Sequence, residues 1–128
     1  DAFFEGARMG YSRNFIKKMK ADPDKEFHGL FTPRQVAENR ATDPSRPQDI
    51  KNNANALAGH NVLEDLPKIK NETLVICAAK DRQTPKSMNE QIASKIPNSK
   101  LVVIEKAGHD SPLEKAPEVN QHIIDFLK

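Results

Sequence analysis

The pattern of apolar and polar positions divides the chain near Asp65. Before this point apolar residues recur every three or four positions, which predicts helices, and no strand-like run occurs. After it, two continuous apolar runs alternate with helical stripes. We therefore expect a helical segment over residues 1–62, followed by a strand, helix, strand, helix unit over residues 63–128.

The opening stretch predicts one long helix that Asp22 and Pro23 end. Gly6 and Gly10 weaken this helix, and Ser12 falls within it. Its basic residues are expected on the solvated face. The apolar face is formed by Phe4, Ala7, Tyr11, Phe15 and Met19, and the basic cluster by Arg13, Lys17, Lys18 and Lys20.

Two further helices are predicted in the first part. Thr32 is a favoured N-cap residue, and Pro33 suits the first helical position that follows it. After a proline-rich loop, the next helix is expected from position 47 or 48 to Leu57, with Gly59 as its stop.

The second part predicts an α/β fold with a short parallel sheet. Residues 73–79 (TLVICAA) and 101–105 (LVVIE) are continuous apolar runs, which are typical of strands that are covered on both faces. A helical stripe between them ends at Pro97, which gives a β-α-β unit. The last helix is expected after Ala116.

Composition excludes several classes of function. Twenty Lys and Arg residues are interspersed with 18 Asp and Glu residues, so the net charge of +2 gives no sign of a nucleic-acid-binding protein. No apolar run approaches the roughly 20 residues that span a bilayer, so we expect no membrane partner. The single cysteine, Cys77, excludes an intrachain disulfide, fits a reducing, cytoplasmic location and reads as a buried strand residue.

No cofactor is predicted. His28, His60 and His122 lack the spacing of metal ligands, and no carboxylate or cysteine cluster accompanies them. No glycine-rich loop that would hold a nucleotide phosphate follows a strand.

Candidate chemistry lies where the two strands end. Asp81 follows the first strand and His109 follows the second. Neighbouring parallel strands lie about 4.8 Å apart, so residues just beyond their ends can come within hydrogen-bond reach. An aspartate that accepts from one imidazole nitrogen fixes the tautomer and leaves the other nitrogen as a general base. Asp81 and His109 are therefore the predicted catalytic pair.

Residues 63–128 resemble the carboxyl-terminal end of the α/β-hydrolase superfamily. In that family a D-x-x-T/V-P motif follows the penultimate strand, and a Gly-His motif with a nearby Glu-x-Pro follows the last one. Asp81 with Thr84 and Pro85 matches the first motif, and Gly108-His109 matches the second, although Lys115 lengthens Glu-x-Pro to Glu-x-x-Pro from Glu114 to Pro117. The resemblance implies that Asp81 and His109 are the acid and base of a triad, and that residues 1–62 are a helical cap.

The sequence departs from the family at the nucleophile. Neither the G-x-S-x-G elbow nor the loop of the oxyanion hole is present. Ser12 stands in the only local imitation, but no strand precedes it, so we do not expect it to be the nucleophile. We expect the serine in a missing segment or in another chain. The alternative is a binding module that kept the fold without the activity.

If the enzyme is complete, the resemblance implies an ester, lactone, amide or related acyl substrate. The aromatic residues of the first part suit an apolar acyl group, and they suit ordinary packing equally well. These residues are Phe3, Phe4, Tyr11, Phe15, Phe27 and Phe31.

The strand at residues 73–78 lacks the neighbour that a complete fold would supply on its other side. An exposed apolar strand edge is a template for pairing. We therefore expect a homo-oligomer, or a complementary amino-terminal segment, with Leu74 and Ile76 at the contact.

Overall fold

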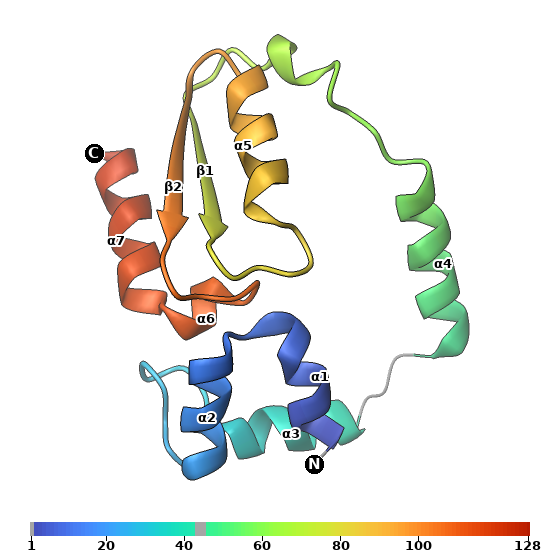
Figure 1. Ribbon diagram of the computed structural model, residues 1–128, viewed down its shortest axis with the longest axis vertical. Coiled ribbons are helices and arrows are strands. Elements are labelled where there is room, and N and C mark those ends of the chain that lie inside the picture. Colours follow the sequence, from blue (N-terminus) through green and yellow to red (C-terminus); the bar gives the residue numbers. More distant parts are fainter. Residues whose placement is uncertain (1, 43–45) are drawn as a thin grey trace.

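A computed structural model describes residues 2–42 and 46–128 of the chain. It consists of a helical segment and a strand, helix, strand, helix unit (Figure 1). The elements are α1 (Ala2–Gly10), α2 (Arg13–Ala21), α3 (Pro33–Thr42), α4 (Pro47–Ala58), a 3-10 turn (Leu66–Lys68), β1 (Thr73–Ala78), α5 (Lys86–Lys95), β2 (Ser99–Ile104), α6 (Ser111–Glu114) and α7 (Ala116–Leu127).

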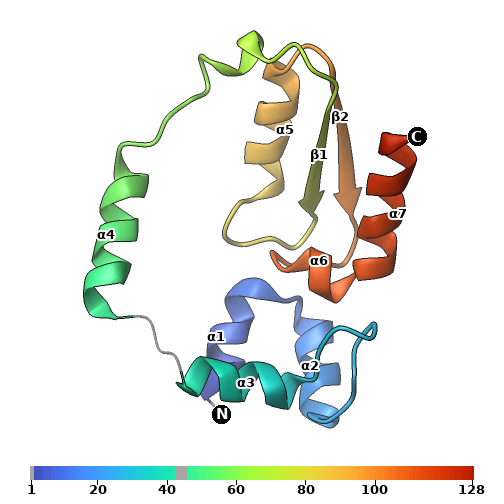
Figure 2. The same cartoon turned by 180° about the vertical axis from the view of Figure 1, so that it is seen from behind.

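The predicted parallel pair of strands is confirmed. β1 and β2 run in register from Thr73 beside Ser99 to Ala78 beside Ile104. Helices α5 and α7 lie on opposite sides of the pair in both views (Figures 1 and 2). Ala78, Ile104, Ala107 and Val119 form a small buried core between the strands and α7.

Local signals placed α3 and α4 correctly. The Thr32 hydroxyl accepts the Gln35 N–H at 3.2 Å, and the Gln35 side chain accepts the Thr32 N–H at 3.2 Å, so α3 begins with a reciprocal capping box. Helix α4 ends at Gly59 as predicted. It stands apart from the other helices (Figures 1 and 2), and none of its residues is buried.

The prediction of one continuous opening helix is wrong, because the chain breaks at Tyr11 and Ser12. The Gly10 carbonyl accepts the Asp110 N–H at 2.7 Å, which takes it out of the helical ladder. Ser12 then caps α2 by accepting the Phe15 N–H at 3.3 Å. A contact that is distant in sequence therefore overrides the helical periodicity.

The helical segment has an aromatic core of its own. The ring centroids of Phe15 and Phe27 lie 4.8 Å apart in an edge-on arrangement, and Phe27 stacks on Phe31 at 5.9 Å. Tyr11 lies 5.5 Å from Phe15. Ala7, Ile16 and Met19 complete this cluster. Most of the aromatic side chains of this segment thus pack against one another.

A buried carboxylate joins the helical segment to the loop that follows β2. Glu114 is only 4% exposed. Its carboxylate accepts the Ser12 N–H at 2.9 Å, the Gly108 N–H at 3.0 Å and the Ser12 hydroxyl. The His28 ring lies 3.0 Å from the Glu114 backbone oxygen. These bonds seat the turn between α1 and α2 on the loop that carries His109.

Two glycines allow this close approach. A Cβ at Gly108 would lie 2.6 Å from the Gly10 carbonyl oxygen and 2.8 Å from the Ser12 nitrogen, both of them backbone atoms. A Cβ at Gly10 would meet the Asp110 carboxylate. The two backbones can therefore touch only where side chains are missing.

Among the described residues, no helix is both long enough and apolar enough to cross a membrane.

Replacement of Gly108 by alanine should loosen this junction. The added methyl group meets backbone atoms that cannot rotate away, so we expect Gly108→Ala to lower the free energy of unfolding by about 1–3 kcal/mol in urea denaturation. Gly59→Ala is the matched control, because a Cβ there meets nothing within 4 Å and φ is −104°. Equal midpoints for the two variants would contradict the close approach.

Removal of the Glu114 side chain should destabilise the folded chain. Glu114→Ala leaves the buried N–H groups of Ser12 and Gly108 without an acceptor, and we expect a loss of about 2–3 kcal/mol in the free energy of unfolding. Glu118→Ala is the control, because Glu118 is exposed and forms only a surface ion pair with Lys115. A Glu114→Ala midpoint that matches the control would show that the carboxylate does not hold the junction.

Candidate active site

The ends of β1 and β2 are held side by side beyond the strands themselves. The Ala79 N–H donates to the Ile104 carbonyl at 3.0 Å, and the Lys80 N–H donates to the Ala107 carbonyl at 2.9 Å. The loop that carries Asp81 therefore stays in contact with the loop that carries His109. The paired strand ends thus position both side chains.

Asp81 and His109, predicted from separate parts of the sequence, form a hydrogen-bonded pair. Asp81 Oδ2 lies 2.9 Å from His109 Nδ1. The Asp81 side chain is only 6% exposed, whereas that of His109 is 36% exposed. The carboxylate is therefore enclosed, and the imidazole is open to solvent on one side.

Three further donors fix the Asp81 carboxylate. Oδ1 accepts the N–H groups of Gln83 at 2.8 Å and Thr84 at 3.0 Å, and Oδ2 accepts the Thr84 hydroxyl at 2.8 Å. Burial raises the pKa of Asp81, but the Thr84 N–H, the His109 ring, the Thr84 hydroxyl and the Gln83 N–H together hold that pKa below its ordinary value. Asp81 is therefore an anion at neutral pH.

An anionic Asp81 determines the chemistry of His109. A carboxylate can only accept, so Nδ1 carries the proton and its N–H donates a hydrogen bond to Oδ2. Nε2 is then the acceptor nitrogen, and no described residue forms a hydrogen bond with it. The arrangement presents an oriented general base.

Ser12 is not placed to act as a nucleophile. Its hydroxyl donates to Glu114 and accepts the Phe15 N–H, and the residue is 8% exposed. Cys77 is buried on β1. Burial raises the pKa of the Cys77 thiol, which opposes formation of a nucleophilic thiolate.

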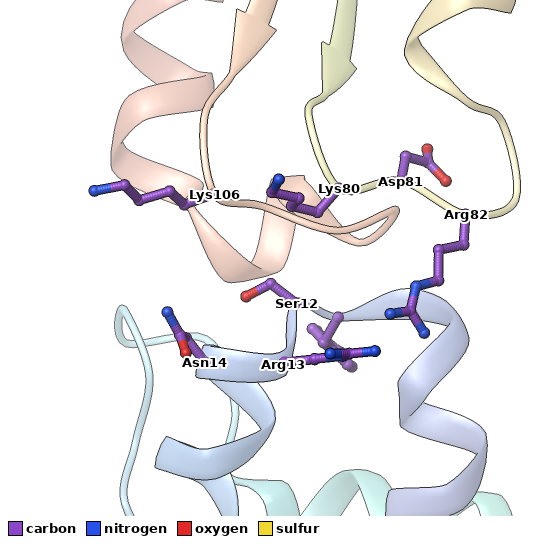
Figure 3. A pocket seen from close by; sticks show the side chains of 8 residues that line it. Ser12, Arg13, Asn14, Lys80, Asp81, Arg82 and Lys106 are labelled. Atoms are coloured by element: carbon purple, nitrogen blue, oxygen red, sulfur yellow. The ribbon is translucent and has the colours of Figure 1, made fainter.

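Asp81 borders an open cavity of about 480 Å³ between the sheet edge and the start of α2 (Figure 3). Its lining includes Lys80, Asp81 and Arg82 from the loop after β1, and Lys106 from the loop after β2. Tyr11, Ser12, Arg13 and Asn14 complete the wall. His109 lines a separate hollow of about 270 Å³, which it shares with Asp81, Thr84 and Asn89. Within residues 2–42 and 46–128, no group of three or more His, Cys, Asp and Glu side chains could hold a metal ion.

Sequence reasoning missed two features of this region. Glu114 was matched to a motif, but nothing local shows that its carboxylate bonds to Ser12 and Gly108. Arg13 is exposed, as predicted for a solvated helix face, but the sequence did not show that it also lines the cavity. No local signal identifies the bond to Ser12 or the cavity, because Ser12 lies 102 positions from Glu114 and the loops after β1 and β2 lie far from Arg13 in sequence.

Comparison with known proteins supports the assignment of the fold. Over 62 residues the chain is 39% identical to 2-hydroxy-6-oxononadienedioate/2-hydroxy-6-oxononatrienedioate hydrolase 1 of Pseudomonas putida, which covers 48% of this chain and 22% of that protein. A thermophilic esterase from Thermogutta terrifontis superposes with a TM-score of 0.50 and 36% identity, over 52% of this chain and 24% of the esterase.

A longer superposition includes the helical segment. The enol-lactonase from Burkholderia xenovorans LB400 matches 98% of this chain and 44% of its own chain, with a TM-score of 0.76 and 19% identity, which shows a shared fold. The chain spans about a quarter of the length of the curated relatives that it matches. The family described as alpha/beta hydrolase fold matches residues 5–116, and the chain therefore belongs to the α/β-hydrolase fold family.

Proposed function

We propose that the chain supplies the acid and the base of a Ser-His-Asp hydrolase, with Asp81 as the acid and His109 as the base. The nucleophilic serine lies outside these residues, in another segment or another chain. The observation that carries this proposal is the 2.9 Å contact between Asp81 Oδ2 and His109 Nδ1, which leaves Nε2 of a partly exposed ring without a hydrogen-bond partner among the described residues.

In this mechanism His109 Nε2 removes the proton of the serine hydroxyl as the serine oxygen attacks the acyl carbon. Asp81 stabilises the imidazolium that forms. His109 then gives the proton to the leaving group, and a water molecule, activated in the same way, releases the acid and restores the serine. The donors that hold the oxyanion also lie outside these residues.

We propose an ester, lactone, amide or related acyl compound as the substrate. The likeness to an esterase and to a dioate hydrolase supports a hydrolytic reaction. The His109 ring is partly exposed and lines a hollow of about 270 Å³, which leaves room for a small acyl group beside the base.

The assignment is tested in the natural gene product that contains these residues. We expect His109→Ala to lower kcat/KM for p-nitrophenyl acetate by about 10⁴-fold or more, because the general base is lost, and Asp81→Asn by about 10⁴-fold, because the tautomer is no longer fixed. His60→Ala, at an exposed position near α4, is the control. Turnover within about tenfold of the wild type in His109→Ala would refute the role of His109.

We further propose that the free edge of β1 is covered by another strand, which a second copy supplies when the 128-residue chain is alone. Within the described residues the sheet has two strands, and Leu74, Val75 and Ile76 are only half-buried. The Thr73 N–H donates to the carbonyl of Asn98, just before β2, at 2.9 Å, so it points toward β2. Because N–H groups alternate in direction along a strand, those of Leu74 and Ile76 point to the free edge.

Light scattering at micromolar concentration tests this edge. The 128-residue chain should form a dimer or a larger species, and Leu74→Pro should reduce it to a monomer, because proline removes a donor on the free edge without breaking the pairing with β2. Leu74→Ala, which keeps the N–H group, is the control, and circular dichroism verifies that each variant is folded. A monomeric wild-type chain would contradict the proposal.

A further inference from the structure

The cavity beside Asp81 is strongly basic. Its walls carry four cationic side chains, and Asp81 is its one acidic lining residue. The cationic residues are Arg13, Lys80, Arg82 and Lys106. They come from three separate parts of the chain: the start of α2, the loop after β1 and the loop after β2 (Figure 3).

Two of these cations border a second cavity as well. A hollow of about 360 Å³ is lined by Arg13 and Arg82, together with Tyr11, and adds Arg8 and Lys17. Figure 3 shows the Arg82 side chain extending from the loop after β1 toward the α1–α2 turn, where Arg13 lies. Both guanidinium groups therefore stand at the boundary of the two hollows.

These charges are not neutralised by the part of the chain that the structure describes. None of the four cations lies within 4 Å of a described carboxylate, whereas Arg8, Arg34 and Arg46 each form an ion pair. Asp81 directs both carboxylate oxygens to other donors, which are His109, Gln83 and Thr84. Four cations around one cavity repel one another, so an anion placed between them is stabilised.

The backbone adds to this positive field. Helix α2 is nine residues long and begins at Arg13, with Ser12 as its N-cap. Arg13 and Asn14 occupy its first two positions and line the cavity. The first N–H groups of a helix have no intrahelical acceptor, and the helix dipole favours negative charge at this end. Glu114 already accepts the Ser12 N–H and hydroxyl at this end, so the helix start adds to the guanidinium groups only through the N–H groups of Arg13 and Asn14.

We propose that this cavity binds an oxyanionic group, a carboxylate or a phosphate, carried by the substrate. Guanidinium forks match the two oxygens of either group. The inference rests on the proposed function, because Asp81 lines this cavity and also the hollow that His109 lines, so the anion site adjoins the proposed acid and base. The enzyme then selects charged acyl substrates over neutral ones.

Two esters with the same leaving group test this selectivity in the natural gene product. The neutral ester is p-nitrophenyl butyrate, and the charged ester is mono-p-nitrophenyl succinate. We expect Arg82→Ala and Arg13→Ala each to lower kcat/KM for the succinate ester by about 10- to 100-fold, mainly through KM, because each removes a charge-assisted hydrogen bond. The butyrate ester should change by less than about threefold.

Matched variants separate the geometry of the guanidinium from its charge. Arg82→Lys keeps the charge and loses the fork, so its effect on the succinate ester should be intermediate. Arg46→Ala is the control, because Arg46 lies at the start of α4 and is paired with Asp49. Equal effects of Arg82→Ala on both esters would overturn the anion site and leave the proposed hydrolase intact.

Calorimetric titration with succinate and with inorganic phosphate gives a readout that needs no turnover. We expect at least one of the two ions to bind the wild type, with an affinity that falls at high salt. In Arg82→Ala the affinity for that ion should fall by about tenfold or more. The ion that binds identifies the class of group. If neither ion binds, the inference is overturned. If an ion binds through Arg82 and neither ester is cleaved, the anion site stands and the proposed hydrolase fails.

Discussion

The buried carboxylate of Glu114 is the interaction on which the arrangement of the site depends. A carboxylate this enclosed is stable only when its oxygens accept hydrogen bonds. It accepts them from the Ser12 N–H, the Ser12 hydroxyl and the Gly108 N–H. These donors belong to two segments about 100 residues apart. One side chain thereby sets the distance between the start of α2 and the loop that presents His109.

The strand ends provide the second constraint. The hydrogen bonds from Ala79 and Lys80 continue the contact between the two loops past the end of the sheet. Asp81 is held in this frame by Gln83 and Thr84, so its charge and its orientation toward His109 are both fixed. Because Glu114 brings α2 to the same edge, the basic side chain of Arg13 lines a cavity with Arg82 and Lys106.

Apolar surface remains uncovered in the part of the chain that the structure describes. The continuous runs of β1 and β2 are suited to burial on both faces, yet most of their residues are only half-buried. Helix α4 exposes Ile50 and Leu57 and buries none of its residues. The buried apolar side chains are therefore divided between the aromatic cluster around α2 and the small core beside α7, rather than gathered in one large core.

The sequence by itself determined the features that rest on local chemistry. Capping residues and prolines placed α3 and α4, continuous apolar runs placed β1 and β2, and the positions after these strands identified Asp81 and His109. Only the tertiary structure decided the break at Ser12, the role of Glu114 and the basic cavity. Helical periodicity reports which residues share a face, but the Asp110 N–H that ends α1 and the residues that surround the cavity come from distant parts of the chain. Hydrogen bonds and charges that meet only after folding leave no local pattern to read.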